Sequence, residues 1–144
     1  EDTIRHIVQS GVPVMGHLGL TPQSVHQFGG FKVQARDAAA AEMLMNQARR
    51  AEESGAFALV LECVPKDVAA KVTQNLSIPT IGIGAGSGCS GQVLVFQDLL
   101  GLNTQFQPRF VRRYLNGFEL VKDALNRCDS DVKSGEFPSE QESY

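Results

Sequence analysis

The run Ala56-Phe57-Ala58-Leu59-Val60-Leu61 is followed directly by Glu62, and this stretch decides how the chain is expected to fold. A continuous apolar run of this length is typical of a parallel strand that is buried on both faces. The Glu62 carboxylate is then expected at the carboxyl end of that strand, partly desolvated. In α/β proteins this edge of the sheet is where substrates bind.

Two other strands are also expected to end in polar or glycine-rich sequence. A strand over 12–17 ends at His17. A later strand over 79–84 runs into a series of glycines, namely Gly82, Gly84 and Gly86. Polar or glycine-rich sequence at three strand ends is typical of the active face of an α/β enzyme.

Helices are expected between these strands. Asp37 can cap an alanine-rich helix that Gly55 ends, and a shorter helix is expected from Lys66 to Leu76. The other expected elements are a helical tail over 1–10, a polar loop over 18–36, a fourth strand over 92–96, a helix cap at Asp98, a helix over 109–133 kinked at Gly117, and a frayed tail from Ser139.

Strands that alternate with helices over short connections predict a parallel sheet with right-handed crossovers. Four such units are half of a (β/α)8 TIM barrel, which typically needs about 250 residues. The fold is therefore expected to be α/β, with residues 1–138 forming half of a single barrel domain and 139–144 a polar tail. A small open sheet is the alternative, but it would leave two unpaired apolar edges, which natural proteins avoid.

Composition and charge argue against several classes of partner. The chain has 144 residues and a net charge of −3, and its longest basic cluster is Arg112-Arg113. No nucleic acid and no membrane are therefore expected as partners. The three cysteines lack the spacing of a zinc site, so they are expected to be free thiols in a cytoplasmic protein.

For each candidate site residue, a purely structural role is the alternative to a functional one. Glu62 is expected to act as a general base, since partial burial suits a carboxylate to that task; the alternative is an ion-paired carboxylate at the sheet edge. His17 is a site candidate or a structural histidine, and the glycine run either admits a ligand to the backbone or serves close packing. No helix opens at the third glycine, so a nicotinamide or flavin cofactor is not expected. His6 and His26 are given no role, and Lys32 and Gln34 are interpreted as a solvated loop face.

Several long motifs carry a resemblance to a known family. They are Gly16-His17-Leu18-Gly19-Leu20-Thr21-Pro22-Gln23-Ser24-Val25, Phe28-Gly29-Gly30-Phe31-Lys32-Val33-Gln34, Leu61-Glu62-Cys63-Val64-Pro65, Ile78-Pro79-Thr80-Ile81-Gly82-Ile83-Gly84-Ala85-Gly86, Gly91-Gln92-Val93-Leu94-Val95 and Ser134-Gly135-Glu136-Phe137-Pro138. In these motifs the chain resembles ketopantoate hydroxymethyltransferase, and the similarity implies the C-terminal half of that enzyme's TIM barrel. Ser90 departs from the family, which commonly has aspartate there.

The resemblance implies transfer of a hydroxymethyl group from 5,10-methylenetetrahydrofolate to 3-methyl-2-oxobutanoate, giving 2-dehydropantoate. Glu62 matches the family's proton acceptor, and His17 is assigned a supporting substrate contact. Mg²⁺ is implied as a cofactor, with ligands expected in the N-terminal half and none in this chain. A homo-oligomer is also implied. Two alternatives stay open: a non-catalytic barrel fragment that only associates with other subunits, and another Mg²⁺-dependent enzyme that enolises 2-oxo acids.

Overall fold

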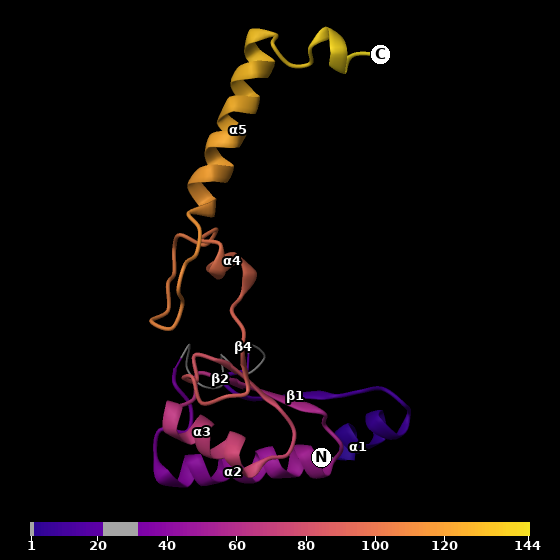
Figure 1. The fold of residues 1–144 in the computed structure, drawn as a ribbon, viewed down its shortest axis with the longest axis vertical. Helices are drawn as coiled ribbons and strands as arrows, with labels where there is room; N and C mark the ends of the chain where they lie inside the picture. The colour runs from indigo at the N-terminus through magenta and orange to yellow at the C-terminus, as the bar shows by residue number, and fades with distance from the viewer. Residues whose placement is uncertain (1, 22–31) are drawn as a thin grey trace. The chain divides into compact units, whose positions relative to one another are not determined.

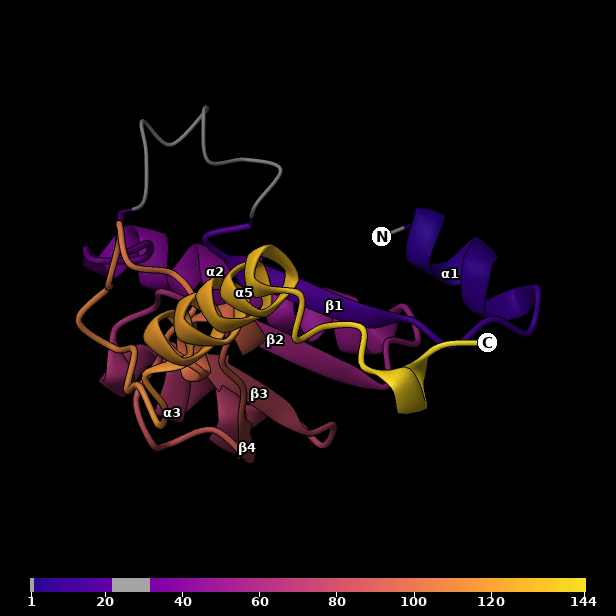
Figure 2. The ribbon, with the colours of Figure 1, turned by 90° about the horizontal axis from the view of Figure 1, so that it is seen from above.

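Four parallel strands form one sheet in the order β1-β2-β3-β4 in the computed structural model of the chain, which describes residues 2–21 and 32–144 (Figures 1 and 2). The strands are β1 (Met15–Gly19), β2 (Ala58–Glu62), β3 (Thr80–Ile83) and β4 (Gly91–Gln92). The helices are α1 (Asp2–Gln9), α2 (Ala38–Glu53), α3 (Lys66–Asn75), α4 (Phe96–Leu99), α5 (Gly117–Ser134) and a 3-10 turn, η2 (Glu140–Glu142). The predicted α/β class with four parallel strands alternating with helices is confirmed.

The chain divides into two compact units, Glu1–Val93 and Leu94–Tyr144. The first unit holds the whole sheet, and the second holds α4, α5 and η2. The assignment of 1–138 to a single barrel domain, with 139–144 as its polar tail, stays a prediction. None of the helices in the described part of the chain combines the length and apolar character that crossing a bilayer would need.

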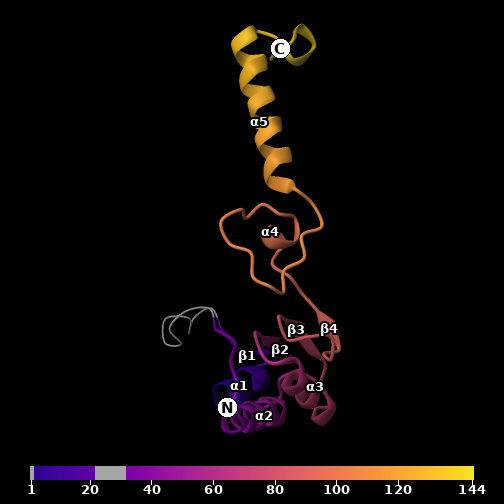
Figure 3. The ribbon, with the colours of Figure 1, turned by 90° about the vertical axis from the view of Figure 1, so that its left-hand side faces the viewer.

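The core of the first unit lies between the sheet and helices α2 and α3, which Figure 3 shows on one side of the strands. Leu59 and Leu61 of β2 are fully buried there, and each contributes roughly 1.5–3 kcal/mol of hydrophobic stabilisation. The stripe of α2 that meets them is Leu44, Ala48 and Ala51.

The ends of α2 follow the predicted signals. The Asp37 carboxylate accepts a hydrogen bond from the Ala40 amide at 2.8 Å, which satisfies one of the unpaired donors in the first turn. At the other end Gly55 follows the C-cap Ser54 with φ +98°, a conformation that favours glycine. The bounds of α2 were therefore readable from local chemistry.

Strand β1 begins later than predicted and also extends further, over Met15–Gly19 in place of 12–17. Pro13 has no amide hydrogen for the ladder, and Val12 is half exposed. Pairing with β2 instead continues in register to Gly19, opposite Glu62. His17 is consequently in the middle of its strand and not at its end, which corrects the prediction.

Strand β4 is only two residues long, whereas a strand over 92–96 was predicted. The Val93 amide still donates to the Gly82 carbonyl, but β3 ends at Ile83, so the chain beyond has no neighbour to pair with. Phe96 begins α4 instead. Asp98 lies inside that helix, where it accepts a hydrogen bond from Asn103, and it caps nothing.

Helix α5 begins at Gly117, so the prediction of a helix from 109 with a kink at Gly117 was wrong. One amide in the preceding segment and two at the start of α5 donate to carbonyls far away in sequence, so the chain before Gly117 does not continue the helix by i to i−4 bonds. These bonds are Tyr114 to Leu99, Gly117 to Leu100 and Phe118 to Gly101. The tail after Ser139 is also more ordered than expected, because η2 has a capping box formed by Ser139 and Glu142.

Candidate functional site

The sheet of the first unit has two different faces. Leu59 and Leu61 point toward α2 and α3 with no exposed surface, so Val60 and Glu62 between and after them point to the opposite face. The register places His17 beside Val60 on that face, and Gly19 beside Glu62. The candidate site lies on this second face, at the carboxyl ends of β1 and β2.

The structure brings together the two residues that the sequence singled out. His17 Nε2 lies 3.0 Å from Glu62 Oε2, a hydrogen-bond distance at which the imidazole N–H donates to the carboxylate. Their side chains are 33% and 19% exposed, so both groups are partly desolvated and still reachable. Within the described part of the chain, Glu62 Oε1 has no hydrogen-bond partner. One carboxylate oxygen is therefore held, and the other is free to accept a proton.

The main chain around Glu62 is tied to three other segments. The Glu62 carbonyl accepts a hydrogen bond from the Leu20 amide at 2.9 Å. The amide of Cys63 donates to the Ile83 carbonyl at 2.9 Å, and the Cys63 carbonyl accepts from the Gln34 amide at 2.8 Å. These bonds fix the direction in which the Glu62 side chain leaves the strand.

Two features of the backbone around Glu62 were not predicted from the sequence. Gly19 has φ +92°, and a Cβ atom built there would lie 2.1 Å from the Glu62 carbonyl oxygen. Cys63 has φ +50°, which is uncommon for a residue other than glycine. The second glycine of Gly16-His17-Leu18-Gly19 could have indicated the close approach, whereas nothing in Leu61-Glu62-Cys63 indicated the turn.

Cys63 follows Glu62 directly but does not resemble a nucleophile. Burial of the thiol raises its pKa, and the neighbouring Glu62 charge raises it further. A thiol with a raised pKa is less ionised at neutral pH and therefore less reactive. Cys63, Cys89 and Cys128 are all free thiols, as predicted.

The glycine-rich stretch after β3 serves close packing within the described chain. A Cβ atom at Gly86 would lie 2.5 Å from Lys66 Cβ, and one at Gly88 would lie 2.8 Å from Ala70 Cβ. Helix α3 therefore already occupies the space that side chains would need. Between the two interpretations, packing is the one that these contacts support at Gly86 and Gly88.

Ser90, the position that departs from the resembled family, binds the start of β3. Its Oγ accepts a hydrogen bond from the Thr80 amide at 3.2 Å, and its amide donates to Thr80 Oγ1 at 3.3 Å. Thr80 is fully buried, and its hydroxyl also lies 2.7 Å from that of Thr73 on α3. Ser90 thus has a structural role in holding the glycine-rich stretch against β3.

The other polar candidates do not join the site. Lys32 is exposed, and the Gln34 side chain donates to the Lys32 carbonyl at 2.9 Å. His6 is exposed on α1. His26 and the middle of the loop over 18–36 lie outside the described residues. Among the residues that the structure describes, no three or more histidine, cysteine or acidic side chains gather where a metal ion could bind.

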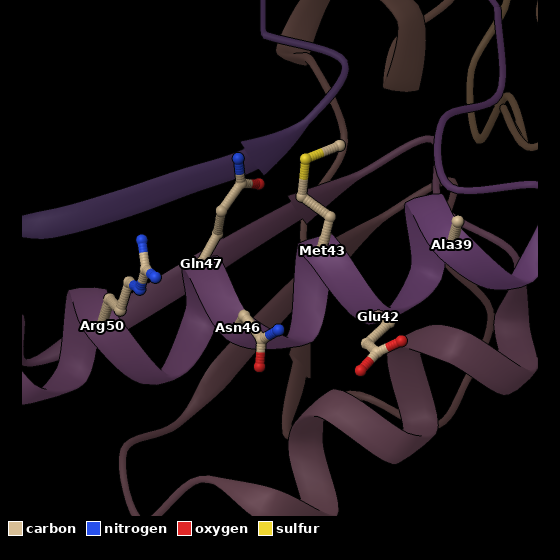
Figure 4. Close-up of a pocket in the computed structure, with 6 residues that line it drawn as sticks. All are labelled: Ala39, Glu42, Met43, Asn46, Gln47 and Arg50. Carbon is tan, nitrogen blue, oxygen red and sulfur yellow. The ribbon is translucent and has the colours of Figure 1, made fainter.

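A surface hollow of about 390 Å³ lies along α2, apart from the His17–Glu62 pair. Its lining residues all come from that one helix: Ala39, Glu42, Met43, Asn46, Gln47 and Arg50. Figure 4 shows Met43 and Gln47 on one side of the helix and Glu42 and Asn46 on the other. Side chains that diverge in this way do not enclose a ligand, so the hollow is not the site.

Comparison with known proteins identifies the family to which the chain is similar. A family model described as ketopantoate hydroxymethyltransferase matches residues 1–140. Three relatives described as 3-methyl-2-oxobutanoate hydroxymethyltransferase come from Bdellovibrio bacteriovorus, Francisella tularensis and Coxiella burnetii. The first is 58% identical over 141 residues, covering 98% of this chain and 54% of the relative. The second is 54% identical over 143 residues, covering 99% and 54%. The third is 58% identical over 135 residues, covering 94% and 51%. The chain thus spans about half the length of these relatives.

Proposed function

Because this chain belongs to the ketopantoate hydroxymethyltransferase family, we propose that it carries the proton acceptor of a 3-methyl-2-oxobutanoate hydroxymethyltransferase. The overall reaction joins 3-methyl-2-oxobutanoate to the methylene carbon of 5,10-methylenetetrahydrofolate. Water supplies the hydroxyl oxygen, and the products are 2-dehydropantoate and tetrahydrofolate. The observation that carries the proposal is the partly buried Glu62 carboxylate, oriented by His17 on the second face of the sheet.

Glu62 is the general base of this proposal. Its free Oε1 takes the proton from C3 of the 2-oxo acid, and the resulting carbon nucleophile forms the bond to the methylene carbon. Proton transfer to a positioned side chain typically contributes a factor of about 10²–10⁴ in rate. His17 is a positioning residue here: by holding Oε2, it leaves Oε1 aimed at the substrate, and a direct substrate contact by His17 is an additional part of the proposal.

The Mg²⁺ ion that the resemblance implies does not fit the described residues. Magnesium prefers six oxygen ligands in octahedral geometry, and the His17–Glu62 pair offers one carboxylate bound to an imidazole. No larger group of candidate ligands occurs in residues 2–21 and 32–144. The steps above therefore use only Glu62 and His17. Assembly as a homo-oligomer in the cytoplasm also remains a proposal.

Exchange of the C3 proton of 3-methyl-2-oxobutanoate with deuterated water tests Glu62 directly, because it requires no folate. The measurement uses this chain with Mg²⁺, alone and mixed with the part of the Bdellovibrio relative that it does not cover. Glu62→Gln should lower the exchange rate by about 10²–10⁴. Glu53→Gln, on the exposed surface of α2, is the matched control and should leave the rate unchanged. Equal rates in the two variants would remove Glu62 from the mechanism.

A further inference from the structure

Backbone strain in the described part of the chain is concentrated beside Glu62. Only two residues other than glycine have a positive φ there, Ala35 at +53° and Cys63 at +50°. Cys63 directly follows Glu62, and Ala35 directly follows Gln34, whose amide donates to the Cys63 carbonyl at 2.8 Å. A positive φ is costly for a residue with a side chain and persists only where the surroundings hold it, and such residues cluster at functional sites.

The conformation of Cys63 changes the face of the sheet to which the chain contributes its side chains. Side chains alternate between the two faces along a strand, so Val64 would share the face of Glu62 if β2 continued. Val64 is instead 2% exposed and belongs to the core together with Leu59 and Leu61. The left-handed residue between Glu62 and Val64 accounts for this change. It makes Glu62 the last side chain of β2 on the second face.

The surroundings hold the turn at Cys63 on both sides. Its amide donates to the Ile83 carbonyl at 2.9 Å, and its carbonyl accepts the hydrogen bond from the Gln34 amide. Val64 is anchored in the core directly after the turn, and α3 begins at Lys66. Because both peptide groups of Cys63 are bound, the turn cannot open without moving the end of β2, where the base is attached.

We propose that Cys63 is a positioning residue for the Glu62 base, an inference that rests on the proposed function. Its left-handed backbone ends β2 at Glu62 and directs the carboxylate to the second face, where His17 holds it. The thiol itself takes no part in the reaction. A misplacement of a catalytic group by about 1 Å can cost roughly 10²-fold in rate. A replacement at position 63 should therefore support the reaction according to how well it accepts a positive φ.

Two substitutions separate the turn from the thiol. Cys63→Val and Cys63→Gly both remove the thiol, but a β-branched residue is strained at a positive φ, whereas glycine adopts it readily. Exchange of the C3 proton, measured as above, should be about 10–10²-fold slower in Cys63→Val than in Cys63→Gly. The NMR signals of the His17 ring should move in Cys63→Val and stay in place in Cys63→Gly, because only the first displaces the Glu62 carboxylate.

Cys89→Val is the matched control. Cys89 is likewise a partly buried free thiol, but it is not among the residues with a positive φ. The same chemical change at this position should leave both the exchange rate and the His17 signals as they are in the unaltered chain. A loss of stability without a change in position would not move the His17 signals of the folded protein.

Equal exchange rates in Cys63→Val and Cys63→Gly would overturn the proposal. If both were fast the turn would not be needed, and if both were slow the thiol would be needed. Thermal unfolding shows whether each variant is folded. Should Cys63→Val not fold, Cys63→Gly is compared with Cys63→Ala and should melt at the higher temperature, because alanine bears the cost of a positive φ. A lower melting temperature for the glycine variant would contradict the proposal.

The His17 signals need no substrate, so they separate this proposal from the proposed function. If Glu62→Gln left the exchange rate unchanged, the role of Glu62 as the base would be lost. The His17 signals would still show whether the conformation of Cys63 places the Glu62 carboxylate. If those signals were the same in Cys63→Val and Cys63→Gly, the positioning role would be wrong while the base could stand.

Discussion

Replacing Gly19 by alanine should disturb the site through a single backbone contact. The new Cβ atom would lie 2.1 Å from the Glu62 carbonyl oxygen and 2.8 Å from Val64 Cγ2. An ordinary contact needs at least 3.4 Å, so β1 would have to move away from β2 by about an ångström. That movement would also loosen the hydrogen bond from the Leu20 amide to the same oxygen.

The free energy of unfolding should fall by about 3–6 kcal/mol in Gly19→Ala. A positive φ costs alanine about 1–2 kcal/mol. Overpacking adds about 1–3 kcal/mol, and a weakened backbone hydrogen bond about 1 kcal/mol. The total is a large part of the roughly 5–15 kcal/mol by which a domain is stable. The chain should therefore be close to unfolding at room temperature.

Gly11→Ala is the matched control, because Gly11 has φ +88° and no atom lies within 4 Å of a Cβ built there. Only the conformational cost remains, about 1–2 kcal/mol. Urea unfolding followed by circular dichroism gives both free energies, and the NMR signals of His17 report on the site. If the two variants lost the same stability and the His17 signals did not move, the close approach of Gly19 to Glu62 would not position the base.

Three other perturbations are expected to have measurable effects. Glu52 accepts hydrogen bonds from the Ser77 side chain and amide at 2.6 and 2.7 Å, which hold the pKa of this carboxyl below its ordinary value. Its stabilisation is therefore complete above the unfolded-state pKa and is lost as the pH falls through the lower folded-state pKa. Glu52→Gln should accordingly lower the melting temperature by a few degrees at pH 7, and this loss should shrink steadily as the pH falls below the ordinary carboxyl value; a loss that did not change with pH would contradict this. Cys63, whose pKa is raised by burial and then by Glu62, should react with a thiol reagent more slowly than exposed Cys128 at pH 8, and Cys128→Ser should abolish the fast phase. The outer edges of β1 and β4 have no partner strand in the described sheet, so the isolated chain should self-associate; a monomer by light scattering would be the opposite result.

Features that depend on local chemistry could be predicted from the sequence. The apolar run before Glu62 identified β2 and its last residue, because a strand that is buried on both faces has a continuous apolar sequence. Asp37 and Gly55 gave the limits of α2 because a helix cap is made within a few residues.

Features that depend on contacts between residues distant in sequence could not be predicted from the hydrophobic pattern. The apolar residues of 109–114 have helical spacing, but the Tyr114 amide is bound to the Leu99 carbonyl, which no periodicity reveals. β4 ends at Gln92, opposite Gly82, and β3 continues for only one more residue. The contact between His17 and Glu62 joins residues 45 positions apart, and it depends on the register of β1 against β2.

That register explains why a histidine can reach a glutamate that is not directly opposite it. Glu62 has Gly19 as its in-register neighbour, and His17 stands two residues earlier on the same face of β1. Diagonal neighbours across a strand pair are roughly 7–8 Å apart, a span that two long side chains can close. A Cβ atom at position 19 would meet the Glu62 carbonyl oxygen and Val64 Cγ2, so glycine at this position admits the close approach of the end of β2. Slipping β1 by one residue would turn His17 toward the helices, so the base and its positioning residue meet only in the register that also buries Leu59 and Leu61.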